Sequence, residues 1–196
     1  MKLILQSIRQ TLVWTVVTGI LYPLVMTVLF QLAFPHQANG SLIQRDGKVV
    51  GSELMAQQFT GPKYFWPRPS AAGYGTGPTG LNASSGSNFG PTSAQLQTNV
   101  RTNAKALRDA SKLAADAPVP ADLVYASASG LDPHISPEGA RFQISRVAAA
   151  RGMSEDQVRA FVEKFTEGSQ WGFLGEPRVN VLLLNLAIDA ADGKKS

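Results

Sequence analysis

Side chains that could form a hydrolase site lie together in one short stretch, SASGLDPHISPEG, which contains Ser127, Ser129, Asp132 and His134. In a Ser-His-Asp triad, histidine takes the proton of the serine hydroxyl and aspartate orients the histidine. Triad members usually converge from distant segments, and the two prolines of this stretch are typical of turns and helix caps. We therefore expect a structural or docking role, with a hydrolase using Ser127, Asp132 and His134 as the alternative.

A second motif, G-x-G-x-x-G at Gly75, Gly77 and Gly80, lies in a segment of unusual composition. Residues 67–93 contain six Gly, four Pro and five Ser, with Arg68 as the only charge. A dinucleotide-binding turn needs a strand before it and a helix that starts within it. Pro67 and Pro69 argue against the strand, Pro78 lies inside the motif, and no helical pattern starts before Thr92. Two hypotheses remain, a flexible linker and an ordered loop that meets a partner.

Composition excludes several kinds of chemistry. The 196-residue chain has no cysteine, which excludes disulfides, thiolate catalysis and cysteine metal sites. Its two histidines, His36 and His134, are too few for a histidine-rich metal centre. We expect no catalytic residue, no metal ligand and no directly bound cofactor.

The N-terminal part contains a candidate transmembrane helix. Residues 11–34 form an apolar run without a charge, longer than the roughly 20 residues that cross a bilayer core as a helix. Pro23 should kink this helix, and Gly19, one turn earlier, offers close approach to another helix. The run is too long for the apolar part of a signal peptide and no convincing cleavage site follows it, so we expect a retained anchor.

The charges around this run predict its orientation. Lys2 and Arg9 precede it, whereas the next charges, Arg45 and Asp46, come well after it. By the positive-inside rule, residues 1–10 should be cytoplasmic, 11–34 transmembrane, and 35–196 exterior or periplasmic. Without Lys2 and Arg9, 16 basic residues face 14 acidic ones, a net charge of +2. This balance and the lack of a basic stripe interleaved with aromatics argue against nucleic-acid binding.

The exterior part should begin with strands and continue mainly with helices. Asp46-Gly47 between apolar pairs predicts a β-hairpin with a type I′ turn, and a short helix capped by Ser52 should follow over residues 52–59. A helix over about 94–116 should be capped by Thr92 or Ser93, because its apolar positions recur at helical spacing. Its basic stripe is either a solvated face or a contact with an acidic partner or lipid headgroups. The members of that stripe are Arg101, Lys105, Arg108 and Lys112.

Three further helices are predicted from their caps. Ser136 with Pro137 starts one that stops at Gly152, and the capping box of Ser154 and Gln157 opens another that runs to about Glu167. The final apolar run suits a helix capped by Asn180, with a short strand before it as an alternative. The expected fold is α+β, a mostly helical exterior domain with a small β-hairpin behind one N-terminal transmembrane helix.

With these elements in order, the chain closely resembles the C subunit of the Kdp-type potassium-transporting ATPase, a bacterial high-affinity uptake complex. Each matching piece is weak alone, but their order and spacing behind one span make the resemblance specific. The pieces are QANGSLI (37–43), GS (51–52), FTG (59–61), YF (64–65), RPSA (68–71), GSN (86–88), ASASGLD (126–132), ISP (135–137), RVA (146–148), Arg151, VN (179–180), LNLA (184–187) and Asp189. Two positions depart from the family pattern, because Pro67 and Ser85 stand where the family usually has glycine.

The resemblance implies a small single-span subunit in the bacterial inner membrane, with a channel-like potassium-translocating subunit and a P-type ATPase subunit as partners. The chain lacks the D-K-T-G phosphorylation motif of that ATPase subunit. The family is described as a catalytic chaperone that assists assembly and raises the ATP affinity of its partner, and ATP binding is often ascribed to it. Because an exterior domain cannot reach cytoplasmic ATP, we expect the complex to handle ATP and potassium, with an indirect effect of this chain on ATP affinity.

On this reading, residues 67–93 form an ordered exterior loop whose glycines let backbone approach backbone, within the domain or against the channel-like subunit. No residue is predicted to be catalytic. The candidates for subunit contact or for ordering the loop are Gly19, Pro23, Arg68, Pro69, Ser70, Gly86, Ser87, Asn88, Ser129, Gly130, Asp132, Arg146, Asn180 and Asn185.

Overall fold

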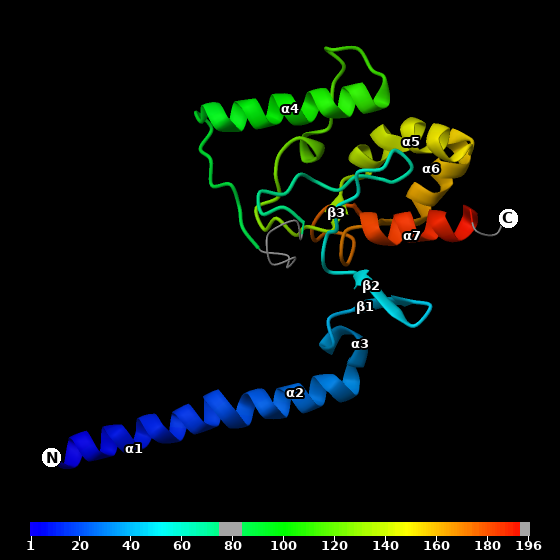
Figure 1. Cartoon of the computed structure of the whole chain (residues 1–196). Coiled ribbons are helices and arrows are strands. Elements are labelled where there is room, and N and C mark those ends of the chain that lie inside the picture. Colours follow the sequence, from blue (N-terminus) through cyan, green and yellow to red (C-terminus); the bar gives the residue numbers. More distant parts are fainter. Residues whose placement is uncertain (75–83, 193–196) are drawn as a thin grey trace. The chain divides into compact units, whose positions relative to one another are not determined.

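The computed structural model describes residues 1–74 and 84–192 and divides into two compact units, Met1–Ser52 and Glu53–Ser196 (Figure 1). The β-hairpin belongs to the first unit, together with the N-terminal helix.

The first unit begins with one long apolar helix, as predicted. Its parts are α1 (Lys2–Val16), a π-helical turn (Val17–Leu21) and α2 (Tyr22–Ala33). The whole helix, Lys2–Ala33, is long and apolar enough to cross a membrane, and its side chains are not buried against protein. It starts nine residues before the predicted apolar run, so Lys2 and Arg9 lie on its first turns.

The π-helical turn shows how the helix accommodates Pro23. Proline has no N–H to donate and its ring clashes with the carbonyl four residues earlier, which is that of Gly19. The wider π turn ends immediately before α2 and contains Gly19. The predicted disturbance at Pro23 therefore takes the form of a π turn, a common way to absorb an irregularity within a helix. A Cβ at Gly19 would meet nothing within 4 Å, so this side of the helix is open.

A short helix, α3 (Pro35–Ala38), leads to the predicted hairpin of β1 (Leu42–Arg45) and β2 (Lys48–Ser52). The strands are antiparallel, with Arg45 opposite Lys48. Asp46 and Gly47 both have positive φ, 52° and 73°, which confirms the type I′ turn.

The predicted helix over residues 52–59 is wrong. Ser52 ends β2, and its hydroxyl donates to the carbonyl of Gly40 instead of capping a helix. The backbone that follows bonds to distant segments: the carbonyl of Glu53 accepts from Asn180, and the amide of Ala56 donates to the carbonyl of Leu131. Long-range hydrogen bonds replace the local ones that a helix would have made.

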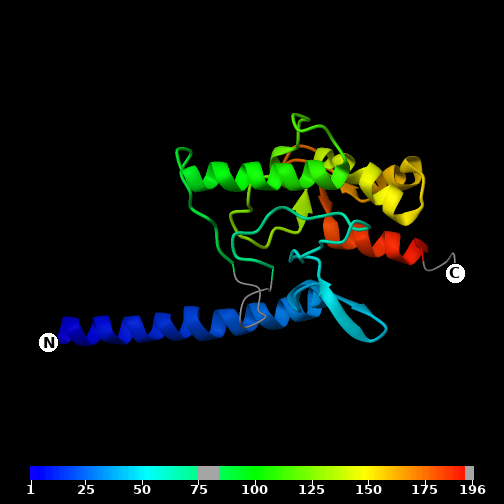
Figure 2. The same ribbon diagram turned by 45° about the horizontal axis from the view of Figure 1, so that its top comes forward.

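The described part of the second unit combines four α-helices with a small sheet. Its elements are α4 (Ala94–Ser111), a 3₁₀ turn (Ala121–Leu123), β3 (His134–Ile135), α5 (Pro137–Arg151), α6 (Glu155–Lys164), β4 (Thr166–Glu167), β5 (Arg178–Asn180) and α7 (Val181–Asp192). The three antiparallel strands have the order β3-β5-β4. In both ribbon views, α4 and α7 lie on opposite sides of the strands and connecting loops (Figures 1 and 2).

One hydrophobic core joins these elements, and Phe65 on a connecting segment is buried completely within it. Leu107 anchors the apolar face of α4, where Val100 and Ala104 are partly buried, as the helical spacing predicted. Leu123 and Val124 contribute from the 3₁₀ turn and the residue after it, and the other buried members come from α5, α6, α7 and the strands. They include Ile135, Ile144, Val147, Val158, Val162, Val179, Leu184 and Ile188.

The predicted helix starts are confirmed, whereas two ends differ. Ser93 and Ser136 cap α4 and α5, and Ser154 forms its capping box with Gln157. Two helices stop before the predicted ends: α4 at Ser111, before a left-handed Lys112, and α6 at Lys164, because Thr166–Glu167 joins the sheet. The final run contains both alternatives, since β5 ends at Asn180, whose side-chain oxygen accepts from the amide of Leu183 in α7. The α+β, mostly helical fold is confirmed.

Candidate functional site

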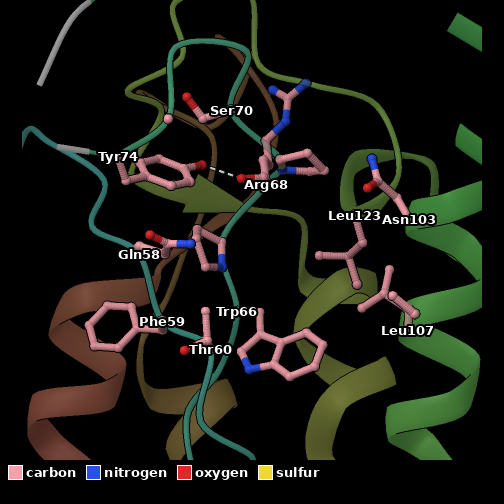
Figure 3. Close-up of a pocket in the computed structure, with 14 residues that line it drawn as sticks. Gln58, Phe59, Thr60, Trp66, Arg68, Ser70, Tyr74, Asn103, Leu107 and Leu123 are labelled. Atoms are coloured by element: carbon pink, nitrogen blue, oxygen red, sulfur yellow. Dashed lines mark hydrogen bonds between the residues drawn. The ribbon is translucent and has the colours of Figure 1, made fainter. Parts of the chain in front are cut away.

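A pocket of 310 Å³ lies between the segment 58–74 on one side and α4 with the 3₁₀ turn on the other (Figure 3). Trp66, Leu107 and Leu123 give it an apolar side, and Arg68 and Tyr74 bring polar groups to it. A small pocket with an apolar floor and few polar groups is the usual form of a binding site. Three of the candidate residues, Arg68, Pro69 and Ser70, line it.

The start of the Gly/Pro/Ser-rich segment is bound to the turn at 126–132. Ser70 and Ser127 form a parallel bridge, and the amide of Ser127 donates to the carbonyl of Pro69 at 2.9 Å. The hydroxyl of Ser70 donates to the carbonyl of Gly130 at 2.7 Å. These bonds fix the pocket wall to a second, distant part of the chain.

The later part of the segment returns to the same turn. The amide of Ser85 and the hydroxyl of Ser84 both donate to the carbonyl of Ser129, at 3.0 Å each. At Gly86 an added Cβ would lie 2.8 Å from the carbonyl oxygen of Ala128. At Gly130, where φ is +70°, an added Cβ would lie 2.9 Å from the carbonyl oxygen of Ser85. Backbone packs against backbone within the unit at these two glycines, as the ordered-loop hypothesis predicts.

The remaining candidate residues of the loop lie in different structural environments. Ser87 is half-buried and lines a second hollow beside α4, whereas Asn88 is exposed and has a φ of 53°. The G-x-G-x-x-G match at Gly75, Gly77 and Gly80 lies outside the described residues. The hypothesis of a flexible linker does not hold for the described ends of the segment, 67–74 and 84–93.

A polar network stands at the edge of the pocket. The guanidinium of Arg68 donates to Asp132 at 2.8 Å, and the other carboxylate oxygen accepts from the backbone amide of His134 at 3.0 Å. The hydroxyl of Tyr74 donates to the carbonyl of Arg68. Partial burial of Asp132 raises its pKa, but the hydrogen bonds from His134 and Arg68 outweigh burial and lower the pKa to about 2. Burial, with the charge of Asp132, raises the pKa of Tyr74 to about 12 against the opposing effect of Arg68.

These values predict a pH dependence of stability. The pKa of Asp132 is depressed from its usual 3.8 to about 2, so its contribution to folding is complete above pH 4 and is lost as the pH falls through 2. The shift corresponds to about 2 kcal/mol. We expect Asp132→Asn to lower the free energy of unfolding by about that amount at neutral pH, and the difference from the parent chain to shrink between pH 4 and pH 2.

Chemical denaturation of the detergent-solubilised chain over this pH range measures the difference. Asp109→Asn is the control, because Asp109 forms an exposed pair with Lys105 on α4. A difference between Asp132→Asn and the parent chain that stays constant from pH 7 to pH 2 would contradict this account of the network.

The hydrolase alternative does not assemble. The hydroxyl of Ser127 is buried and lies 3.2 Å from that of Ser129, and the nearest ring nitrogen of His134 is 3.7 Å from Asp132. Within the described part of the chain, no hydrogen bond joins either serine hydroxyl to His134. Asp132 is instead bound to Arg68, and Ser136 caps α5. The stretch is a structural turn that receives the two ends of the loop.

A second cluster holds the segment that precedes the pocket. Both ends of the Asn185 amide bind residue 65: its oxygen accepts from the Phe65 amide at 2.8 Å, and its nitrogen donates to the Phe65 carbonyl at 3.0 Å. The side chain of Gln143 does the same for Trp66, at 2.8 and 3.1 Å. Two side-chain amides on α5 and α7 therefore take the place of a neighbouring β-strand.

Two arginines complete this clamp, which we call the 62–66 clamp after the residues it holds. Arg146 donates to the carbonyls of Pro62 and Tyr64 at 2.7 and 2.9 Å, and its guanidinium lies 4.1 Å from the Trp66 ring centroid. Burial lowers the pKa of Arg146 to about 10. Arg151 donates to the carbonyl of Lys63 and pairs with two acidic residues of α7, Asp189 and Asp192.

Sequence reasoning found part of the clamp and missed the rest. Arg146 and Asn185 were among the candidates, and Asn180 caps α7 while binding Glu53. Gln143 was missed, although it lies three residues from Ala140 and four from Val147, on the face of α5 that turns to the core. An amide at a core position of a helix is the signal that could have identified it.

Sequence comparisons with known proteins match almost the whole chain. The family described as KdpC, the c chain of the K+-transporting ATPase, matches residues 4–190. A potassium-transporting ATPase KdpC subunit of Methylococcus capsulatus is 58% identical over 186 residues, which cover 94% of this chain and 95% of the relative. The KdpC subunits of Sorangium cellulosum and Burkholderia cenocepacia are 58% and 57% identical, over 92% and 90% of this chain and 93% and 90% of the relatives. Since the match includes the apolar helix, the loop, the turn and the clamp, the chain belongs to the KdpC family.

Proposed function

We propose that this chain is a non-catalytic, single-span subunit of an ATP-driven potassium uptake complex in a bacterial plasma membrane. The observation that carries the proposal is the match to KdpC subunits over more than nine-tenths of both chains. The structure supports a role without chemistry, because the Ser127–His134 stretch is used as a turn and its groups bind loop backbone. The proposed partners are a channel-like potassium-translocating subunit and a P-type ATPase subunit.

The proposed orientation places residues 1–10 in the cytoplasm and 35–196 outside. Lys2 and Arg9 lie on the first turns of the long helix, and Arg45 is the first charge after it. This asymmetry supports a cytoplasmic N-terminus. ATP and the second unit then lie on opposite sides of the membrane, so any effect on ATP affinity is indirect. It acts through conformational states that the subunits share.

The effect on ATP affinity has a direct kinetic test. We expect the ATPase subunit, assembled with the channel-like subunit in lipid nanodiscs, to need more ATP for half-maximal hydrolysis when this chain is left out. Coupling between sites is typically worth 5–150-fold in affinity, and the lower part of that range is enough to detect. Adding the chain back should restore the parent value. An unchanged ATP dependence with and without the chain would remove the chaperone role and leave the assembly role standing.

Assembly should depend on the open side of the long helix. Glycine lets neighbouring helices approach closely in lipid, and Gly19 has free space around it. Gly19→Leu should reduce co-purification of the partner subunits while leaving membrane insertion intact, because leucine is favourable in the bilayer. Val13→Leu on the same helix is the control for an apolar substitution at another exposed position. Equal recovery of partners with Gly19→Leu and Val13→Leu would refute helix packing at this glycine.

Cysteine labelling tests the orientation, since the natural chain has no cysteine. Ser85→Cys and Arg101→Cys change exposed residues of the second unit, and Ser7→Cys changes an exposed residue near the N-terminus. In intact cells whose outer membrane has been permeabilised, cysteines at positions 85 and 101 should react with a membrane-impermeant maleimide. A cysteine at position 7 should not. The reverse pattern would place the second unit in the cytoplasm and make direct contact with ATP possible.

A further inference from the structure

The two short strands β4 and β5 carry an apolar tip between them, drawn in orange in Figure 1. Trp171 and Phe173 are 85% and 74% exposed, and Leu174 is 43% exposed. In the described part of the second unit, seven large apolar side chains are exposed, and three of them fall in this four-residue stretch. Single exposed apolar residues are ordinary, but a cluster marks an interaction surface.

The tip has a defined backbone conformation. The backbones of Gln170 and Leu174 exchange two hydrogen bonds, at 2.8 and 2.9 Å, and close a tight turn. The chain reverses at Trp171 and Gly172, whose φ angles are +53° and +83°. A positive φ is uncommon for a bulky residue such as tryptophan. The turn therefore holds an aromatic side chain outward in a conformation that has an energetic cost and leaves it 85% exposed among the described residues.

Its polar groups suit a low-dielectric environment. The amides of Gln170, Gly172, Phe173 and Leu174 all donate to carbonyls within the tip. Residues 168–175 carry no charge. At the base of the strands, Glu167 pairs with Arg178 at 2.9 Å, and Glu176 is the nearest charge beyond the tip. These four amides do not need water as a partner, which lowers the cost of bringing the tip into contact with lipid.

The predicted membrane anchor of the same chain keeps the second unit close to a bilayer. The apolar helix ends at Ala33 and the second unit begins at Glu53, so residues 34–52 are the only connection. Even fully extended, a connection of that length spans no more than about 65 Å. Tryptophan is enriched at the boundary between lipid and water, where its ring is buried and its N–H stays hydrated.

We propose that the β4–β5 tip is a membrane-contact loop that places Trp171 and Phe173 among the lipid headgroups. The loop would fix the second unit at the bilayer surface by a second point besides the helix. This inference needs only the membrane anchor and is independent of potassium transport.

Site-specific fluorescence on the full chain in phosphatidylcholine nanodiscs tests the proposal. Leu174→Cys carries a small fluorophore next to the intact aromatic pair, and brominated lipid acts as a contact quencher. Tyr125→Cys is the matched control, because Tyr125 is 47% exposed at a distant place in the sequence. We expect brominated lipid to quench the label at 174 and not the label at 125. In a chain that also carries Trp171→Ser and Phe173→Ser, the quenching at 174 should be lost.

Equal quenching at 174 and 125 would overturn the proposal, and so would quenching at 174 that survives the two serine changes. A label at 174 that is unaffected by lipid, and becomes shielded from water only when partner subunits are added, would assign the tip to a protein contact and also overturn it. Because the nanodisc contains this chain alone, failure here leaves the proposed pump function untouched.

Discussion

Replacing Asn185 with leucine should destabilise the second unit by about 3–5 kcal/mol. The leucine side chain is similar in size, but it can neither donate to nor accept from the buried backbone of Phe65. Each buried backbone group left without a partner costs about 1–3 kcal/mol, and here an amide and a carbonyl lose theirs together. Phe65 is completely buried, so water cannot replace Asn185.

Two measurements test this prediction, one of global stability and one of the single hydrogen bond. Denaturant unfolding of the full chain in mild detergent gives the change in free energy, and hydrogen exchange of the Phe65 amide reports the broken bond itself. Asn99→Leu is the matched control, since Asn99 is an exposed residue of α4 whose side-chain oxygen accepts from the nearby exposed side chain of Gln95. If Asn185→Leu unfolds at the same denaturant concentration as Asn99→Leu, the 62–66 clamp is not what holds this segment.

Replacing Gly130 with alanine should cost about 2–4 kcal/mol and release the later part of the loop. Alanine at a φ of +70° costs roughly 1–2 kcal/mol, and its Cβ would also lie 2.9 Å from the backbone oxygen of Ser85. That oxygen belongs to backbone and cannot move aside as a flexible side chain can, so the loop must shift.

Gly152→Ala separates the two causes. Gly152 also has a positive φ, +62°, but an added Cβ there meets nothing within 4 Å. It should cost only the conformational part, about 1–2 kcal/mol. The excess cost of Gly130→Ala, and faster hydrogen exchange at the Ser85 amide, would report the close approach of loop and turn. Equal costs for the two changes, with unchanged exchange at Ser85, would show that the loop does not pack on Gly130.

Some features of this fold could be predicted from the sequence and others could not. Capping residues and apolar spacing act within one or two helical turns, so the starts of α4, α5 and α6 could be predicted from Ser93, Ser136 and Ser154. Residues 52–59 could not, because their backbone partners, Asn180 and Leu131, lie far along the chain. Local propensity is overridden where distant groups satisfy the backbone.

The site shows the same division. The glycines of residues 67–93 predicted close backbone approach, and Gly86 has it, against the turn that contains Gly130. Nothing in the order of the residues indicated that Arg68 binds Asp132, or that Gln143 and Asn185 each bind one residue of the same segment. These contacts join parts of the chain that only folding brings together. Ser127, Asp132 and His134 illustrate the opposite case, because closeness in sequence did not produce a catalytic geometry.

The central claim is that this chain works as one subunit of a potassium pump. Isolation of a tagged full-length chain in mild detergent, from cells starved of potassium, followed by mass spectrometry of the co-purifying proteins, tests it most directly. The account predicts that a channel-like potassium-translocating protein and a P-type ATPase with a D-K-T-G motif are recovered with it in constant ratio, and that Gly19→Leu lowers their yield. Recovery of the chain alone under those conditions, in a detergent that keeps it folded, would contradict the claim.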